Sequence, residues 1–169
     1  ERERAMLPLL LLCLGMLYMS TSWTTALGVV VGMVVLFALN LITRQESMLY
    51  VPCPMPGMQR PSDNPEGYRS PAEKGLEFED VNLTTEDGLR IHCWFIPAPG
   101  DDKKAAPTIL FCHANAGNIG LRLPNFKELV TRLRCNILAV DYRGFGNSEG
   151  SPSEEGLIED ALAAWRWLR

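Results

Sequence analysis

Two glycine-rich loops, residues 111–120 and 140–150, constrain the fold of this chain more than any other feature. Each follows a short apolar run, Thr108–Cys112 for the first loop and Cys135–Val140 for the second. Between the loops, residues 126–133 place apolar side chains at helical spacing. Uninterrupted apolar runs are typical of strands covered on both faces, and strand, helix and strand in succession predict a right-handed crossover between parallel neighbours. The sequence therefore predicts an α/β fold.

The segments on either side extend this pattern. Residues 76–85 alternate apolar and polar side chains as a half-buried strand does, and residues 89–96 return after an Asp-Gly turn as an antiparallel strand at the sheet edge. Near the other end, Ser151 is the predicted N-cap of a final helix, with Pro152 in its first position. The predicted buried stripe of that helix has four members: Leu157, Ala161, Trp165 and Leu168.

The N-terminal region carries no charged residue from Ala5 to Thr43, a tract of 39 residues. As one helix it would measure about 58 Å, nearly twice the ~30 Å hydrocarbon core of a bilayer. Ala26–Ile42 is the predicted span, with Trp23 at the membrane interface. Met6–Met19 is interpreted as a second helix of a hairpin, an interfacial segment or the apolar region of a signal peptide. The sequence thus predicts an integral protein of the plasma membrane or an endomembrane, single-pass or with a hairpin.

A buried pair of globular helices is disfavoured, because this tract has almost no polar face. The chain therefore divides into an anchor region at 1–44, a Pro-rich linker at 45–75 and a folded part at 76–169. Its net charge of −4, without a basic stripe, argues against nucleic acid as a partner. Five Cys residues without a CxxC pair indicate neither a disulfide framework nor a zinc site. We expect no metal and no cofactor, since phosphate loops and dinucleotide fingerprints are also absent.

The loops and the segment between them contain three longer motifs: His-x-Asn-Ala-Gly-Asn-Ile-Gly at 113–120, Arg-Leu-Pro-Asn at 122–125 and Asp-Tyr-Arg-Gly-x-Gly-x-Ser-Glu-Gly at 141–150. With these motifs the chain resembles the membrane-anchored α/β-hydrolase domain-containing proteins of the bud-emergence type, which belong to the serine hydrolase superfamily. The resemblance implies an incomplete α/β-hydrolase fold, with an edge hairpin and parallel strands after an apolar transmembrane segment. Residues 76–169 would be the N-terminal half of the hydrolase domain.

In that fold, backbone N–H groups after the first parallel strand stabilise the oxyanion of acyl transfer. The resemblance therefore assigns His113, Ala114, Asn115 and Gly117 to an oxyanion-hole or substrate loop, with the N–H groups near Ala114 and Asn115 as donors. His113 would shape the loop rather than act as the base. The family has Gly where this chain has Ala114, and Ala would be strained there if the position required a positive φ.

The second loop begins with Asp141 and Arg143, which are predicted to order it through structural contacts rather than to take part in chemistry. His92, on a strand near the sheet edge, is interpreted as a partly exposed strand residue.

Residues 146–150 match the pattern G-x-S-x-G, which in α/β hydrolases marks the nucleophile. That serine works on a strained turn that joins a strand directly to a helix. Here the predicted strand ends near Val140 and the predicted helix begins at Ser151, so Ser148 lies in a long loop and is disfavoured as the nucleophile. The resemblance places the nucleophile, and the Asp and His that follow it, beyond Arg169.

The sequence therefore predicts the N-terminal portion of a membrane-anchored serine hydrolase. Its expected partners are membrane lipid and an acyl ester or thioester substrate, either a lipid or an acylated protein. Because no catalytic triad is present, we expect the chain by itself to be inactive. The alternative is a non-catalytic membrane adaptor that keeps half of the hydrolase fold. Its last strand would be exposed, a liability that native proteins normally cover.

Overall fold

The computed structural model describes residues 8, 11–16, 18, 22–100, 103 and 105–169. The chain forms two compact units, one up to Gln45 and one from Glu46 to Arg169.

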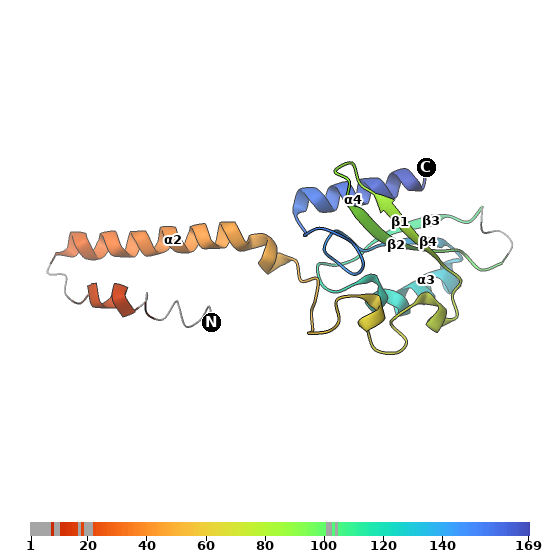
Figure 1. Ribbon diagram of the computed structural model, residues 1–169, viewed down its shortest axis with the longest axis horizontal. Coiled ribbons are helices and arrows are strands. Elements are labelled where there is room, and N and C mark those ends of the chain that lie inside the picture. Colours follow the sequence, from red (N-terminus) through yellow and green to blue (C-terminus); the bar gives the residue numbers. More distant parts are fainter. Residues whose placement is uncertain (1–7, 9–10, 17, 19–21, 101–102, 104) are drawn as a thin grey trace. The chain divides into compact units, whose positions relative to one another are not determined.

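The second unit contains a four-stranded sheet in the order β1-β2-β4-β3 (Figure 1). Its strands and α-helices, in chain order, are β1 (Glu79–Thr84), β2 (Arg90–Ile96), β3 (Thr108–Cys112), α3 (Leu123–Leu133), β4 (Asn136–Val140) and α4 (Glu154–Trp167). β1, β2 and β4 are antiparallel neighbours, whereas β3 lies parallel to β4, with α3 as the crossover. The predicted α/β fold with an N-terminal edge hairpin and parallel strands is confirmed.

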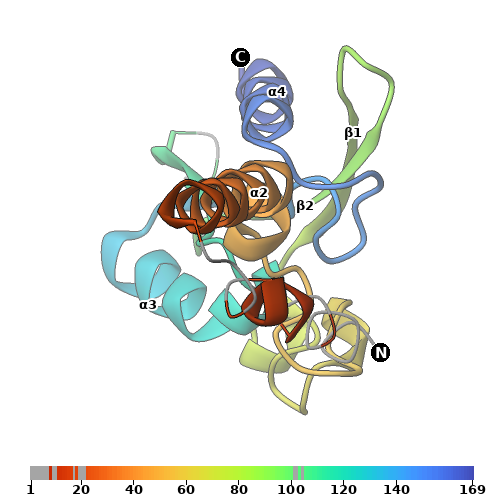
Figure 2. The same cartoon turned by 90° about the vertical axis from the view of Figure 1, so that its left-hand side faces the viewer.

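Both faces of the sheet are covered, by α3 on one side and α4 on the other (Figure 2). Side chains alternate along β4, so Ile137 faces Phe126 of α3 while Leu138 faces Ala164 of α4. All five residues of β4 are buried, as expected for a central strand. This packing fixes the carboxyl ends of β3 and β4, from which the two glycine-rich loops depart.

The start of the last helix differs from the prediction. Ser153, not Ser151, is the N-cap, and its side chain accepts a hydrogen bond from the Gly156 amide. Gly156 lies in the first turn of this helix, where a Cβ would come within 2.4 Å of the Arg143 side chain. The predicted buried stripe is also partly wrong, because Trp165 is 52% exposed. The buried residues of this helix are Gly156, Asp160, Ala163 and Ala164.

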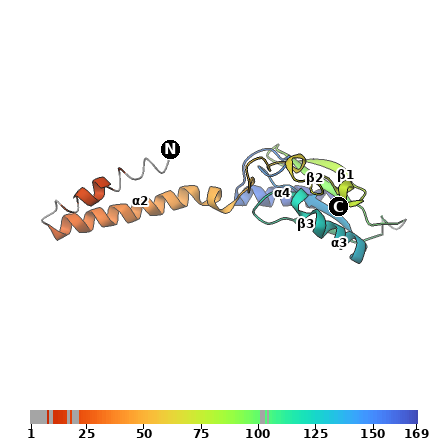
Figure 3. The same cartoon turned by 90° about the horizontal axis from the view of Figure 1, so that it is seen from below.

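The apolar N-terminal region contains α2 (Trp23–Leu49), which includes the predicted span Ala26–Ile42 (Figure 3). Among the described residues this is the one helix long and apolar enough to cross a membrane, with a mean hydropathy of 2.4 over an 18-residue window. No residue of α2 is buried. Of the predicted first piece, Met6–Met19, residues 11–16 are helical, and several of the others lie outside the described residues.

Candidate functional site

Three segments meet at one edge of the sheet because of how the strands pair. β3 and β4 end there, and β2 begins there, since Cys93 is paired with Val140 and the Asp141 amide donates to the His92 carbonyl. In open α/β sheets this edge is where ligands bind. The candidate site therefore contains the loop after β3, the loop after β4 and the first residues of β2.

The loop after β3, residues 113–117, is called the substrate loop below. Ala114 and Asn115 are exposed, and no acceptor within the described residues engages either of their amide N–H groups. Arg134 is the only described non-glycine residue with a positive φ, so the strain considered for Ala114 is not present. Gly117 does have a positive φ, of 71°, and a Cβ there would come within 2.5 Å of the Leu121 side chain.

A segment that directly follows the apolar helix holds the substrate loop in place. The Val51 amide donates to the Asn115 carbonyl (2.8 Å), and the Gly117 amide donates to the Val51 carbonyl (3.0 Å). The Asn115 side chain donates to the carbonyl of Leu49, the last residue of α2 (2.7 Å). We call residues 49–51 the strap. It pairs with the loop as a parallel β-bridge between Val51 and Ala116.

His113 is the first residue of the substrate loop, and its side chain is buried. Its Nδ1 atom is 2.6 Å from the Ala114 carbonyl, and its ring packs against the rings of Tyr142 and Phe145, each at a centroid distance of 5.1 Å. Burial lowers the pKa of His113, although the nearby Asp141 opposes the shift. Through these contacts the imidazole supports the loop backbone.

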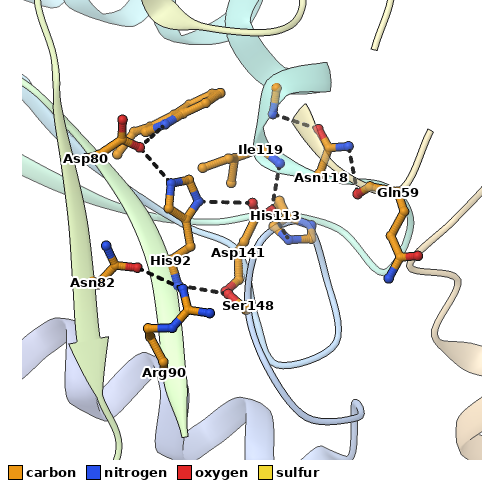
Figure 4. A network of polar contacts seen from close by, with 12 residues as sticks. Gln59, Asp80, Asn82, Arg90, His92, His113, Asn118, Ile119, Asp141 and Ser148 are labelled. Atoms are coloured by element: carbon orange, nitrogen blue, oxygen red, sulfur yellow. Dashed lines mark hydrogen bonds and ion pairs between the residues drawn. The ribbon is translucent and has the colours of Figure 1, made fainter. Parts of the chain in front are cut away.

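Asp141 lies between two histidines and is completely buried (Figure 4). Its Oδ1 atom accepts a hydrogen bond from the Ile119 amide (2.8 Å), at the end of the motif that contains the substrate loop. His113 Nε2 is 3.7 Å from Oδ1, and His92 Nδ1 is 3.6 Å from Oδ2. Asp141 thus connects the loops after β3 and β4.

His92 is buried, so the expectation that it would be partly exposed is wrong. Its Nε2 atom is 2.7 Å from Asp80 on β1, whose carboxylate also accepts from the Trp94 indole (2.9 Å). Burial lowers the pKa of His92, but the hydrogen bonds and charges of Asp141 and Asp80 outweigh this effect and raise the pKa above its ordinary value. The sequence did not predict this cluster, since it depends on pairing Asn82 with His92 across the hairpin.

Arg143 has partners other than Asp141. Its guanidinium and its amide bind the buried carboxylate of Asp160 on α4, at 2.7 to 3.0 Å, and the guanidinium also contacts Asp87 in the β1–β2 turn. These ion pairs tie the loop after β4 to α4 and to the hairpin. A hydrogen bond from Thr85 and the guanidinium of Arg143 lower the pKa of Asp87.

Ser148 lies in a turn between β4 and α4 with its hydroxyl engaged on both sides. Its Oγ atom donates to the Asp141 carbonyl and accepts from the His92 amide at 2.9 Å. Ser148 has no positive φ, and α4 begins only at Glu154. The hydroxyl therefore lacks both the strained turn and the free hydrogen-bonding capacity of a nucleophile.

A polar cavity of about 510 Å³ opens beside this cluster, lined by side chains of both charges that include Arg60, Asp80, Arg90, His92, Ser148 and Glu149. It does not include the substrate loop. Among the described residues, no group of three or more His, Cys, Asp or Glu side chains is arranged to hold a metal ion.

Comparison with known proteins gives consistent matches, although no family model matches the chain. Over 134 residues the chain is 41% identical to the alpha/beta hydrolase domain-containing protein WAV2 of Arabidopsis thaliana, covering 79% of this chain and 41% of that protein. It is 34% identical over 135 residues to protein bem46 of Schizosaccharomyces pombe, covering 80% and 43%. The chain thus spans less than half the length of these curated relatives.

Among solved structures, the chain resembles the esterase Pf2001 of Pyrococcus furiosus, with a TM-score of 0.50 and 27% identity. The match covers 59% of this chain and 36% of the esterase.

Proposed function

Because this chain belongs to the α/β-hydrolase domain-containing proteins of the bud-emergence type, we propose that it is the N-terminal portion of a membrane-anchored serine hydrolase. The observation that carries this proposal is the substrate loop. Ala114 and Asn115 are exposed residues at the sheet edge where ligands bind, and their amides have no acceptor within the part of the chain that the structure describes. Backbone donors held ready in this way are what an oxyanion requires.

In this function a serine attacks the carbonyl carbon of an ester or thioester, and the carbonyl oxygen becomes an anion. Donors about 2.7–3.1 Å from that oxygen lower the barrier, and removing one costs about 10²–10³ in kcat. The loop amides would supply such donors. The nucleophile and its partners would lie in the region of the full-length protein that corresponds to the unmatched part of the relatives. Within the described part of the chain, β3 has β4 as its only neighbour, which leaves its other edge for the strand before the nucleophile.

The proposed substrates are acyl esters or thioesters, either lipids or acylated proteins. α2 supports this choice because a helix of its length and hydropathy suits a membrane span, which would place the enzyme among lipid substrates. We accordingly propose an integral location in the plasma membrane or an endomembrane.

A labelling experiment on the full-length protein tests this function. An activated phosphonate probe should label one serine that lies outside residues 1–169. The Ser148→Ala variant should be labelled as efficiently as the wild type. Ala114→Pro removes one amide donor and should lower the labelling rate and kcat by about 10²-fold, whereas Ala114→Gly keeps the amide and should retain both. A full-length protein that no phosphonate labels would contradict the proposal and would favour the adaptor hypothesis instead.

A further inference from the structure

The strap and the substrate loop are far apart in the sequence yet share three hydrogen bonds, two through Val51 and one from Asn115 to Leu49. Within the strap, Val51 is exposed and belongs to neither core, whereas Tyr50 packs against the core that contains Phe145 and so anchors the strap beside the loop. The strap contacts the loop through its backbone groups. These hydrogen bonds orient peptide groups rather than bury surface.

We propose that the strap is a positioning element that couples the oxyanion-hole amides to helix α2, so that the site acts on acyl esters presented at a membrane surface. This inference rests on the proposed function and adds two things to it. It names the residues that set the loop geometry, and it specifies that the substrate is presented at a membrane surface.

The hydrogen bonds around the loop determine where its free amides point. The Ala114 carbonyl is held from one side by His113 Nδ1 and by the Ala116 amide. In a trans peptide the N–H of the next residue points the opposite way, so the Asn115 amide is directed away from His113. The strap then fixes the following peptide group, since the Asn115 carbonyl accepts from Val51.

Without the strap, the Asn115 carbonyl and the Gly117 amide would lose their partners. The Ala116 carbonyl would keep its bond from the Arg122 side chain (2.8 Å). The loop combines small residues with a glycine at a positive φ, so it would gain conformational freedom. An error of about 1 Å in the position of such donors can cost 10²-fold in rate. The strap is therefore expected to affect kcat more than stability.

Chain length limits how far the loop can be from the membrane, however the two units are arranged. The apolar span ends at Ile42 and the strap begins at Leu49. Seven residues cover at most about 25 Å when fully extended and about 10 Å when helical. If α2 spans a bilayer, the substrate loop must stay near its surface for as long as the strap is bound.

Hydrogen exchange on the full-length protein tests the strap itself. Val51→Pro removes the amide that donates to Asn115 and should accelerate exchange across residues 113–118 by roughly tenfold or more. Val51→Ala is the matched variant, since it keeps the amide and changes only an exposed side chain, and should retain wild-type protection. Asn115→Ala removes the bond to Leu49 and should give a smaller acceleration. If Val51→Pro and Asn115→Ala both exchange as the wild type does, the loop does not depend on the strap and the proposal is wrong.

Kinetics of the full-length protein test the coupling. Val51→Pro should lower kcat for a soluble short-chain ester by roughly tenfold with little change in KM, an effect that a purely structural role would not produce in the folded fraction. A flexible Gly/Ser insertion after Arg44 leaves the strap intact. It should reduce hydrolysis of a vesicle-embedded ester by about threefold or more, while the soluble ester changes by less than about twofold.

The outcomes separate the two proposals. A wild type that hydrolyses neither ester contradicts the hydrolase function and, with it, this inference. A wild type that hydrolyses both, with the insertion having the same effect on each, supports the hydrolase and overturns the coupling to the membrane.

Discussion

The loops after β3 and β4 leave the same edge of the sheet, but they use their polar groups in opposite ways. In the loop after β4, Arg143 binds Asp160 and Asp87, and the Ser148 hydroxyl bonds on both sides. In the substrate loop, side chains and the strap hold the carbonyl oxygens, and no described residue accepts from the Ala114 or Asn115 amide. A loop whose charged and hydroxyl side chains are bound within the fold serves the structure, whereas a loop that turns backbone donors toward a ligand is suited to stabilising a negative charge.

The comparison also shows why a five-residue pattern misleads. The match to G-x-S-x-G falls in the loop after β4, where Gly146 is required for a reason unrelated to catalysis. A Cβ at Gly146 would lie 1.9 Å from Asp141 Oδ2, so the glycine makes room for the buried carboxylate. The substrate loop contains no serine and would be missed by a search for nucleophiles.

The largest effect should come from Arg143, because its removal leaves the fully buried carboxylate of Asp160 without a counter-charge. We expect Arg143→Met to lower the free energy of unfolding by about 3–5 kcal/mol. Arg132→Met is the control, since Arg132 pairs with Glu128 on the surface of α3 and should cost less than about 1 kcal/mol. Urea unfolding of the full-length protein measures both, and equal losses would show that the loop after β4 is not held by its buried ion pair.

Gly146→Ala should give the next largest effect. The φ of Gly146 is +54°, and the added methyl group would force Asp141 away from the Ile119 amide, so we expect a loss of about 2–4 kcal/mol. Gly57→Ala is matched in backbone, with a φ of +80°, but nothing lies within 4 Å of its Cβ position. That variant should lose only about 1 kcal/mol. Similar losses in thermal or urea unfolding would mean that strain alone, and not contact with Asp141, explains the glycine.

Ser148→Ala should destabilise the protein moderately without affecting chemistry. It removes the acceptor of the His92 amide and the donor to the Asp141 carbonyl, with an expected cost of about 1–3 kcal/mol. Turnover per folded molecule should stay at the wild-type level. Ser62→Ala, at an exposed serine, should leave stability within about 0.5 kcal/mol. Loss of all turnover from a folded Ser148→Ala protein would instead identify Ser148 as the nucleophile. The loop after β4 would then have a catalytic role rather than a structural one.

The sequence predicts the strands well because their signals are local. The apolar run of β3 has the same bounds in the structure as in the prediction, and that of β4 differs by one residue. Neither the cluster around His92 nor the strap has such a signal. The cluster depends on the register of β2 against both neighbours, and the strap depends on a bridge between Val51 and Ala116, far apart in the chain. Periodicity identifies strands but does not determine which of them meet.

The smallest expected effect is a pH dependence of stability in which the two buried histidines act in opposite directions. The carboxylates of Asp80 and Asp141 raise the pKa of His92 in the folded state above the ordinary value of 6.5, so folding favours its protonated form. The stability that His92 contributes is therefore complete below 6.5 and is lost as pH rises through the raised value. For His113, burial lowers the pKa, so its contribution is present above 6.5 and is lost as pH falls.

Urea unfolding, whose denaturant carries no charge to screen these pairs, should be followed from about pH 5 to about pH 9 for the wild type, His92→Gln and His113→Gln. The advantage of the wild type over His92→Gln should shrink as pH rises, and its advantage over His113→Gln should shrink as pH falls. If both differences had the same slope, the two histidines would share one electrostatic environment. That result would contradict the contrast between two environments. His92 lies in an acidic cluster next to the loop after β4, whereas His113 packs against aromatic rings and supports the substrate loop.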